Sequence, residues 1–86
     1  MSSTEMLARI QEVKRRREAE LLRKANVVAV GIGYRRRGGR LTDELCLVVS
    51  VRRKVPPEAL APEDYIPSEI DGVPVDVQEV GVLRAL

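Results

Sequence analysis

The sequence contains no histidine, no tryptophan and no phenylalanine. Histidine is the usual general base, the usual activator of serine and cysteine nucleophiles, and the commonest metal ligand. Its absence argues against most hydrolytic and metal-dependent enzymes. We therefore expect a protein that is not an enzyme, with no catalytic residue, no metal ligand and no cofactor site.

Cysteine is almost as scarce, since Cys46 is the only one. It cannot form an internal disulfide or a cysteine-based metal cluster within one chain, and its place in an apolar run predicts a buried, unreactive thiol. No stretch approaches the roughly 18 apolar residues of a membrane span. The N-terminal segment MSSTEMLARI also lacks the basic region and apolar run of a signal peptide. These absences predict a cytoplasmic protein with no membrane partner.

Aromatic residues are limited to Tyr34 and Tyr65, so the core has to be built from valine, leucine, isoleucine and alanine. The length of 86 residues predicts a single domain over residues 1–86. A chain of this size buries only about two thirds of its unfolded surface, and an added interface would stabilise it. Homo-oligomerisation is therefore expected.

A helix is predicted over residues 4–24. Ser2-Ser3-Thr4-Glu5 has the pattern of a capping box, and no glycine or proline follows as far as Lys24. The apolar positions of this segment fall into two groups separated by the charged run of residues 14–18. Either the first group projects toward a neighbouring subunit, or Arg17 lays its aliphatic stem across the same sheet and closes the gap.

Three strands are predicted over residues 27–35, 44–53 and 73–80, where apolar residues alternate or run continuously. A loop of about six to nine residues containing Gly38-Gly39 would join the first two as a β-hairpin. The fold class expected is α+β, with a long N-terminal helix followed by a three-stranded, mainly antiparallel sheet built on this hairpin. The pattern leaves open a short extra strand around residues 66–70.

Gly31 and Gly33 lie on the same face of the first predicted strand. Glycines in this arrangement indicate that another element approaches the strand closely. A dinucleotide-binding loop is the alternative, but its third glycine and following helix are missing. We therefore interpret both glycines as packing positions.

Charge is distributed unevenly along the chain. Residues 1–54 carry a net charge of +8 and residues 55–86 a net charge of −6. The two halves either attract each other between molecules or neutralise each other within one fold. Basic clusters at residues 14–17, 35–40 and 52–54 also allow nucleic-acid binding as an alternative, although this rests on charge alone because aromatic stacking platforms are lacking.

The leading hypothesis is a self-association module that forms a homo-oligomer, in the form of a closed ring or an extended filament or tube. Its candidate interface consists of the apolar residues Met6, Leu7, Ile10, Val13, Val82, Leu83 and Leu86. Its candidate charge-mediated contacts are Arg15, Arg16, Arg35, Arg36, Arg37, Arg40, Arg52, Arg53, Glu63, Asp64 and Asp71.

The order of residues also resembles a known family over about residues 25–81. The segments NVVAVGIGY, TDELCLVVSV and IPSEIDGVPVDVQEVG are similar to the small N-terminal domain that precedes the protease domain in a group of bacterial trypsin-like serine proteases. The resemblance implies a propeptide-like or regulatory accessory module, with a trypsin-like protease domain as its partner. It carries over no catalytic residue, since the sequence ends at Leu86, where that domain would begin.

Overall fold

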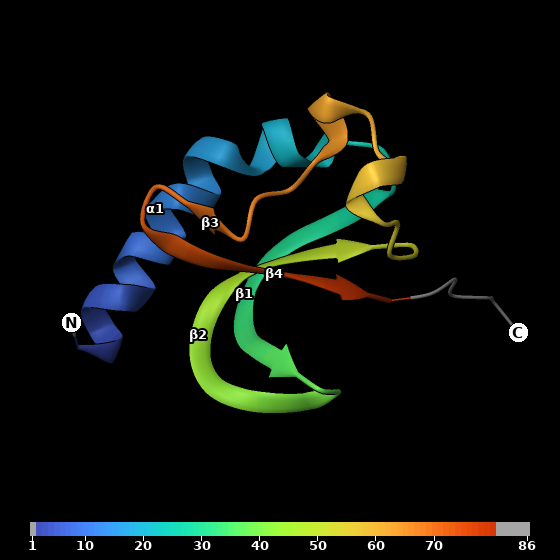
Figure 1. Ribbon diagram of the computed structural model, residues 1–86. Coiled ribbons are helices and arrows are strands. Elements are labelled where there is room, and N and C mark those ends of the chain that lie inside the picture. Colours follow the sequence, from blue (N-terminus) through green and yellow to red (C-terminus); the bar gives the residue numbers. More distant parts are fainter. Residues whose placement is uncertain (1, 81–86) are drawn as a thin grey trace, which may run out of the picture.

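The computed structural model describes residues 2–80 and has an α+β fold, in which one helix lies along one face of a four-stranded mixed sheet (Figure 1). The elements are α1 (Ser3–Leu22), β1 (Val27–Arg37), β2 (Arg40–Val51), β3 (Glu69–Ile70) and β4 (Val73–Glu79), with the 3-10 turns η1 (Pro57–Ala59) and η2 (Pro62–Asp64) between β2 and β3. The predicted α+β class and the N-terminal helix are confirmed.

The number and direction of the strands differ from the prediction. The sheet order is β1-β2-β4-β3, and β4 runs parallel to β2, so the sheet is mixed. Residues 52–72 account for the difference, because they carry the chain back along the molecule before β4 begins, as a parallel pairing requires. The short extra strand that the sequence pattern allows around residues 66–70 is present as the two-residue β3, antiparallel to β4.

The hairpin turn is tighter than expected. Gly38 and Gly39 have φ values of +57° and +80°, and Arg37 pairs directly with Arg40. Two consecutive residues with positive φ give a turn whose twist matches the flanking strands, so β1 and β2 extend to the turn on both sides. The strands therefore run to Arg37 and from Arg40, rather than to 35 and from 44.

The helix packs on its own sheet. Ser2 Oγ accepts a hydrogen bond of 3.2 Å from Glu5 N, so the helix begins where the capping box predicts. Ile10, Val13 and Leu21 are almost fully buried, and they pack against the core side of β2 and β4. The alternative of an N-terminal half that projects toward a neighbour is therefore wrong for Ile10 and Val13, since both belong to the core of the same chain.

Arg17 fills the gap in the apolar stripe of the helix. It lies between Val13 and Leu21 at helical spacing, and its guanidinium reaches the turn between β3 and β4. Arg17 Nε donates to Asp71 Oδ2 at 3.2 Å and Arg17 Nη2 donates to Asp71 Oδ1 at 3.4 Å. Arg9 Nη2 donates to the carbonyl oxygen of Asp71 at 3.2 Å. Helix and turn are thereby held together, and Arg17 lowers the pKa of Asp71 below its ordinary value of 3.8.

Asn26 fixes the junction between α1 and β1. Its φ of +76° lies in the left-handed region, which asparagine tolerates better than most residues. Asn26 O accepts a hydrogen bond of 2.9 Å from Arg52 N, and Asn26 Nδ2 donates to Arg53 O. The end of the helix and the end of β2 are therefore joined through one residue.

Substituting Asp71→Asn tests the contact between helix and turn. Asparagine tolerates the φ of +51° at this position as aspartate does, but it carries no negative charge. Because the pKa of Asp71 is lowered in the folded state, its contribution is present above pH about 4 and is lost as the pH falls through the lowered value. We expect the variant to be less stable than the wild type at neutral pH, with a difference that shrinks below pH about 3.8 in urea unfolding. A Glu58→Gln control, which removes the same charge elsewhere, should not show this pH dependence.

Substituting Asn26→Ala tests the junction. Alanine loses the hydrogen bond to Arg53 O and disfavours the positive φ, so the free energy of unfolding should fall by about 1–2 kcal/mol. Asn26→Gly keeps the backbone conformation and loses only the side-chain bond, and its stability should lie between the two. Urea unfolding of the three proteins checks the order, and an Asn26→Ala variant as stable as the wild type would contradict it.

Candidate interaction surfaces

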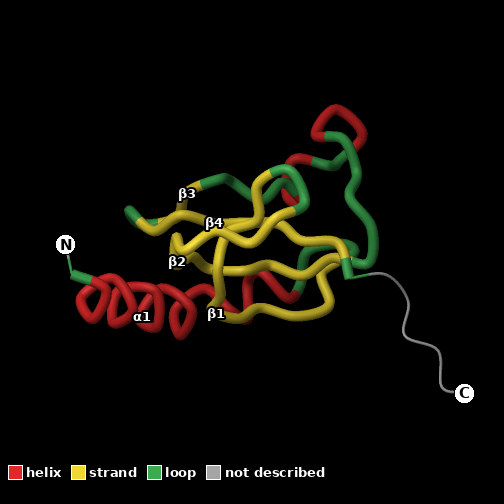
Figure 2. The backbone as a smooth tube through the Cα atoms, turned by 90° about the horizontal axis from the view of Figure 1, so that it is seen from below, coloured by secondary structure: helices red, strands yellow, loops and turns green. Residues whose placement is uncertain are grey.

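The face of the sheet that points away from α1 carries a shallow groove, which we call the sheet groove. Figures 1 and 2 show the helix on one side of the strands only. The groove has a volume of about 370 Å³ and is lined by Ala29, Val30, Gly31, Ile32, Gly33, Tyr34, Leu41, Val48, Ser50 and Gln78. Tyr34 is 48% exposed and Leu41 is 64% exposed at the end nearest the hairpin turn. Within residues 2–80, no helix covers this face.

The two glycines of β1 differ in their surroundings. A Cβ atom at Gly33 would lie 3.2 Å from Cγ2 of Val48, so this glycine allows close packing as expected. A Cβ atom at Gly31 would meet nothing within 4 Å. The predicted close approach is therefore wrong for Gly31 in the described part of the chain, and the groove is open at that position.

The hairpin end bends over the far end of the sheet groove. Asp76 Oδ2 accepts from Arg36 N at 2.9 Å, and Gln78 Nε2 donates to Tyr34 O at 3.2 Å, so side chains of β4 hold β1 across β2. The pairing of β1 and β2 shifts register between Tyr34 and Arg36, which permits this bend. Cys46 is fully buried beneath it, and burial raises the pKa of its thiol to about 11. The prediction that Cys46 is buried is confirmed.

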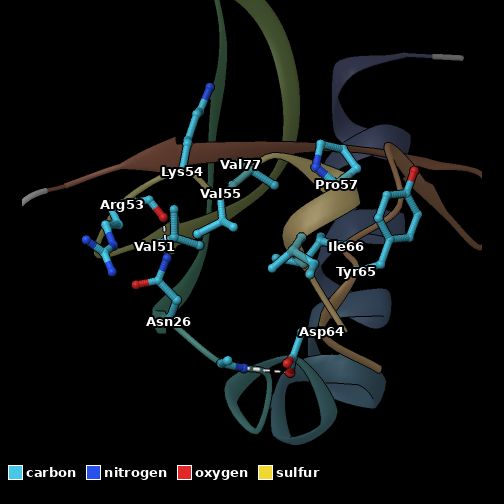
Figure 3. Close-up of a pocket in the computed structure, with 12 residues that line it drawn as sticks. Asn26, Val51, Arg53, Lys54, Val55, Pro57, Asp64, Tyr65, Ile66 and Val77 are labelled. Carbon is cyan, nitrogen blue, oxygen red and sulfur yellow. Dashed lines mark hydrogen bonds between the residues drawn. The ribbon is translucent and has the colours of Figure 1, made fainter. Parts of the chain in front are cut away.

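A second concave surface lies on the other side of the sheet, at the junction of three segments (Figure 3). We call it the apolar pocket. Its volume is about 160 Å³, and it is lined by Ala25, Asn26, Val51, Arg53, Lys54, Val55, Pro57, Leu60, Asp64, Tyr65, Ile66 and Val77. In Figure 3, Val51 and Val55 lie across the pocket from Ile66, and the side chains of Arg53 and Lys54 point away from this apolar floor.

Hydrogen bonds hold the walls of the apolar pocket together. Asp64 Oδ1 accepts from Ala25 N at 2.9 Å, and Lys24 Nζ donates to Glu63 O at 2.6 Å, which ties the 3-10 turns to the end of the helix. The bond from Asn26 Nδ2 to Arg53 O closes the opposite wall. The pocket is therefore formed before any ligand binds.

Several of the predicted charge-mediated contacts are made within the chain. Arg16 Nη2 lies 3.7 Å from Asp71 Oδ2, so Asp71 is shared with Arg17. Arg35 Nη1 and Arg37 Nη2 lie 3.3 Å and 3.7 Å from the carboxylate of Glu44. Arg15 pairs with Glu12 on the helix surface. Of these pairs, only those of Asp71 with Arg16 and Arg17 join the two oppositely charged halves of the chain, so neutralisation between the halves is seen at Asp71.

Other charges have no ion pair within residues 2–80. The predicted residues in this group are Arg36, Arg40, Arg52, Arg53 and Glu63. The hairpin end that carries the first two of them lies at the opposite end of the molecule from the 3-10 turns (Figure 1). Asp64 is used in the pocket wall, as described above.

The predicted apolar interface is not a single surface. Met6 packs against the edge of the core, and Leu7 is 37% exposed on the helix. Ile10 and Val13 are core residues. The remaining members, at positions 82, 83 and 86, lie outside the described residues.

The apolar pocket and the sheet groove were not predicted as sites. The pocket combines residues from three parts of the chain between positions 25 and 77, and neither periodicity nor a short motif reveals such a combination. The asparagine between the helix and the first strand was the one available signal, because asparagine is enriched at positive φ. Across residues 2–80, no group of three or more metal-ligating side chains is present. In the same range, no helix is long and apolar enough to cross a membrane.

Comparison with known proteins corrects the resemblance found in the sequence. No curated protein matches this chain. The family model that matches is the NARROW LEAF 1 N-terminal domain, over residues 6–82, and not the N-terminal domain of bacterial trypsin-like proteases. A bacterial protease-accessory module, with a protease domain as partner, is therefore not retained. The match spans most of the 86 residues, and the chain belongs to the NARROW LEAF 1 N-terminal domain family.

Proposed function

We propose that this domain is a non-enzymatic module that self-associates through the sheet groove and forms a homo-oligomer. The observation that carries the proposal is the open position at Gly31, in a groove lined by small and apolar residues, where a Cβ atom would meet nothing within 4 Å in the described chain. Exposed Tyr34 and Leu41 add to this surface.

A second copy of the chain is the proposed occupant, and the charge distribution supports it. Arg36 and Arg40 stand at the hairpin end beside the groove, without an ion pair in the range 2–80, and Glu58 and Glu63 stand likewise at the 3-10 turns. Since these groups lie at opposite ends of the molecule, they favour a head-to-tail contact between copies. Such a contact closes into a ring or continues as a filament, depending on the rotation between subunits.

Nucleic-acid binding is the weaker alternative. Two of the three basic clusters are partly neutralised, by Asp71 and by Glu44. The clusters also lie on different parts of the molecule and share no aromatic stacking surface. Self-association accounts for both the open groove and the charges that have no ion pair within residues 2–80.

The proposal predicts that Gly31→Lys weakens self-association. The new side chain meets no atom of its own chain at Cβ, so the fold should be kept, but it would stand where a second copy packs. We expect an apparent dissociation constant at least about tenfold higher by sedimentation velocity, and loss of any ring or filament in electron micrographs. Wild-type association should also weaken between about 0.1 M and about 1 M salt, as the Debye length falls from about 10 Å to about 3 Å.

Ala19→Lys is the matched control, because it adds the same charge on an exposed position of α1, away from the groove. It should associate like the wild type. A wild-type protein that remains monomeric at high concentration and low salt contradicts the proposal, as does a Gly31→Lys variant that associates as well as the control.

A further inference from the structure

We propose that the apolar pocket is a recognition site for a peptide that carries one aliphatic side chain flanked by acidic residues. The inference goes beyond self-association, because the pocket lies on the helix side of the sheet. Val51 and Val77 line the pocket and belong to the core side, whereas Val48 and Ser50 line the sheet groove on the other side. The groove and the pocket are therefore separate surfaces, and the 3-10 turns that form one wall of the pocket also carry Glu58 and Glu63.

The size of the pocket determines which side chain of the peptide, the anchor, it can hold. Its volume of about 160 Å³ is smaller than the roughly 300–1,000 Å³ of typical cofactor and drug-sized sites. An apolar cavity of about 150 Å³ holds a molecule the size of benzene. One leucine or isoleucine side chain therefore fills this space, and its floor of Val55, Ile66 and Val77 offers only aliphatic contacts.

The charged residues beside the pocket determine which peptide residues can lie next to the aliphatic side chain. Arg53 and Lys54 line the pocket, and neither has an ion pair in the part of the chain that the structure describes. Arg52 precedes them and is exposed. The carboxylate on the opposite wall, Asp64, already accepts from Ala25 N. Acidic residues of a bound peptide would therefore lie on the side of Arg53 and Lys54, away from Asp64.

The construction of the walls supports recognition without rearrangement. The Asn26–Arg53 and Ala25–Asp64 hydrogen bonds hold both sides of the pocket in place. A preformed pocket lowers the entropic cost of binding. Tyr65, which is 49% exposed at the rim, adds an amphipathic ring of the kind that is enriched at protein interfaces.

Titration of the whole chain with the acetylated peptide Glu-Asp-Leu-Glu-Asp, followed by amide NMR, tests the proposal. The largest amide shifts should occur at Asn26, Val55 and Ile66. The matched peptide with serine in place of leucine should bind at least about tenfold more weakly, because it cannot fill the apolar floor. The matched peptide with lysines in place of the acids should not bind.

Variants separate the two parts of the recognition. Arg53→Gln/Lys54→Gln should weaken binding at least about fivefold and reduce its salt dependence. Ala25→Leu should also weaken binding, because it narrows the pocket at an exposed position that costs the fold little. The control Arg36→Gln/Arg40→Gln removes two charges at the hairpin end and should bind like the wild type. Gly31→Lys should leave peptide binding unchanged, which distinguishes this test from the test of self-association.

Three outcomes would overturn the inference. One is an absence of binding at millimolar peptide. Another is binding that is equal for the leucine and serine peptides, which would show charge attraction alone. The third is a shift of the Val55 and Ile66 amide signals with protein concentration in the absence of peptide that persists in Gly31→Lys, because a second copy would then be the occupant.

Discussion

Strand β2 is the element on which the rest of the molecule depends, because it is hydrogen-bonded along both of its edges, antiparallel to β1 and parallel to β4. Its alternate residues serve two faces. Leu47 and Val49 point into the core under α1, whereas Val48 and Ser50 belong to the sheet groove. Two apolar faces need two covering layers, but the described chain supplies one helix. The open groove thus follows from a shortage of covering elements, rather than from a local irregularity.

The contact between Arg17 and Asp71 shows how a charged residue can hold a place in an apolar stripe. Exposed ion pairs contribute little to stability, and this pair is partly exposed. Its main effect is positional, since two hydrogen bonds from one guanidinium fix the β3–β4 turn against the middle of α1. Ile10, Val13 and Leu21 then pack in the core beneath the middle and the C-terminal half of the helix. Folding thus pairs part of the charge within the chain, whereas Arg36, Arg40, Arg52, Arg53 and Lys54 have no ion pair within residues 2–80.

The sequence predicted what depends on near neighbours. The serine N-cap, the glycine turn and the buried cysteine are each encoded within a few residues, and each is present. What was missed depends on contacts between distant residues. The parallel pairing of β4 arises from the path of residues 52–72, and the apolar pocket joins Ala25, Val51 and Ile66 across the fold. The break in the apolar stripe of the helix left two interpretations open, because Asp71, the partner of Arg17, lies 54 residues further along the chain.

The two proposed surfaces reinforce each other because they lie on opposite faces of the same strands. A side chain on β2 faces either the core side or the groove side, so a second copy in the groove does not contact the valines that line the apolar pocket. A pocket that holds one aliphatic side chain gives low affinity by itself, because that one side chain supplies most of the binding energy. An assembly built through the groove would repeat that pocket in every subunit. A partner with several acidic, leucine-containing segments would then bind through a high effective concentration, and weak individual sites would suffice.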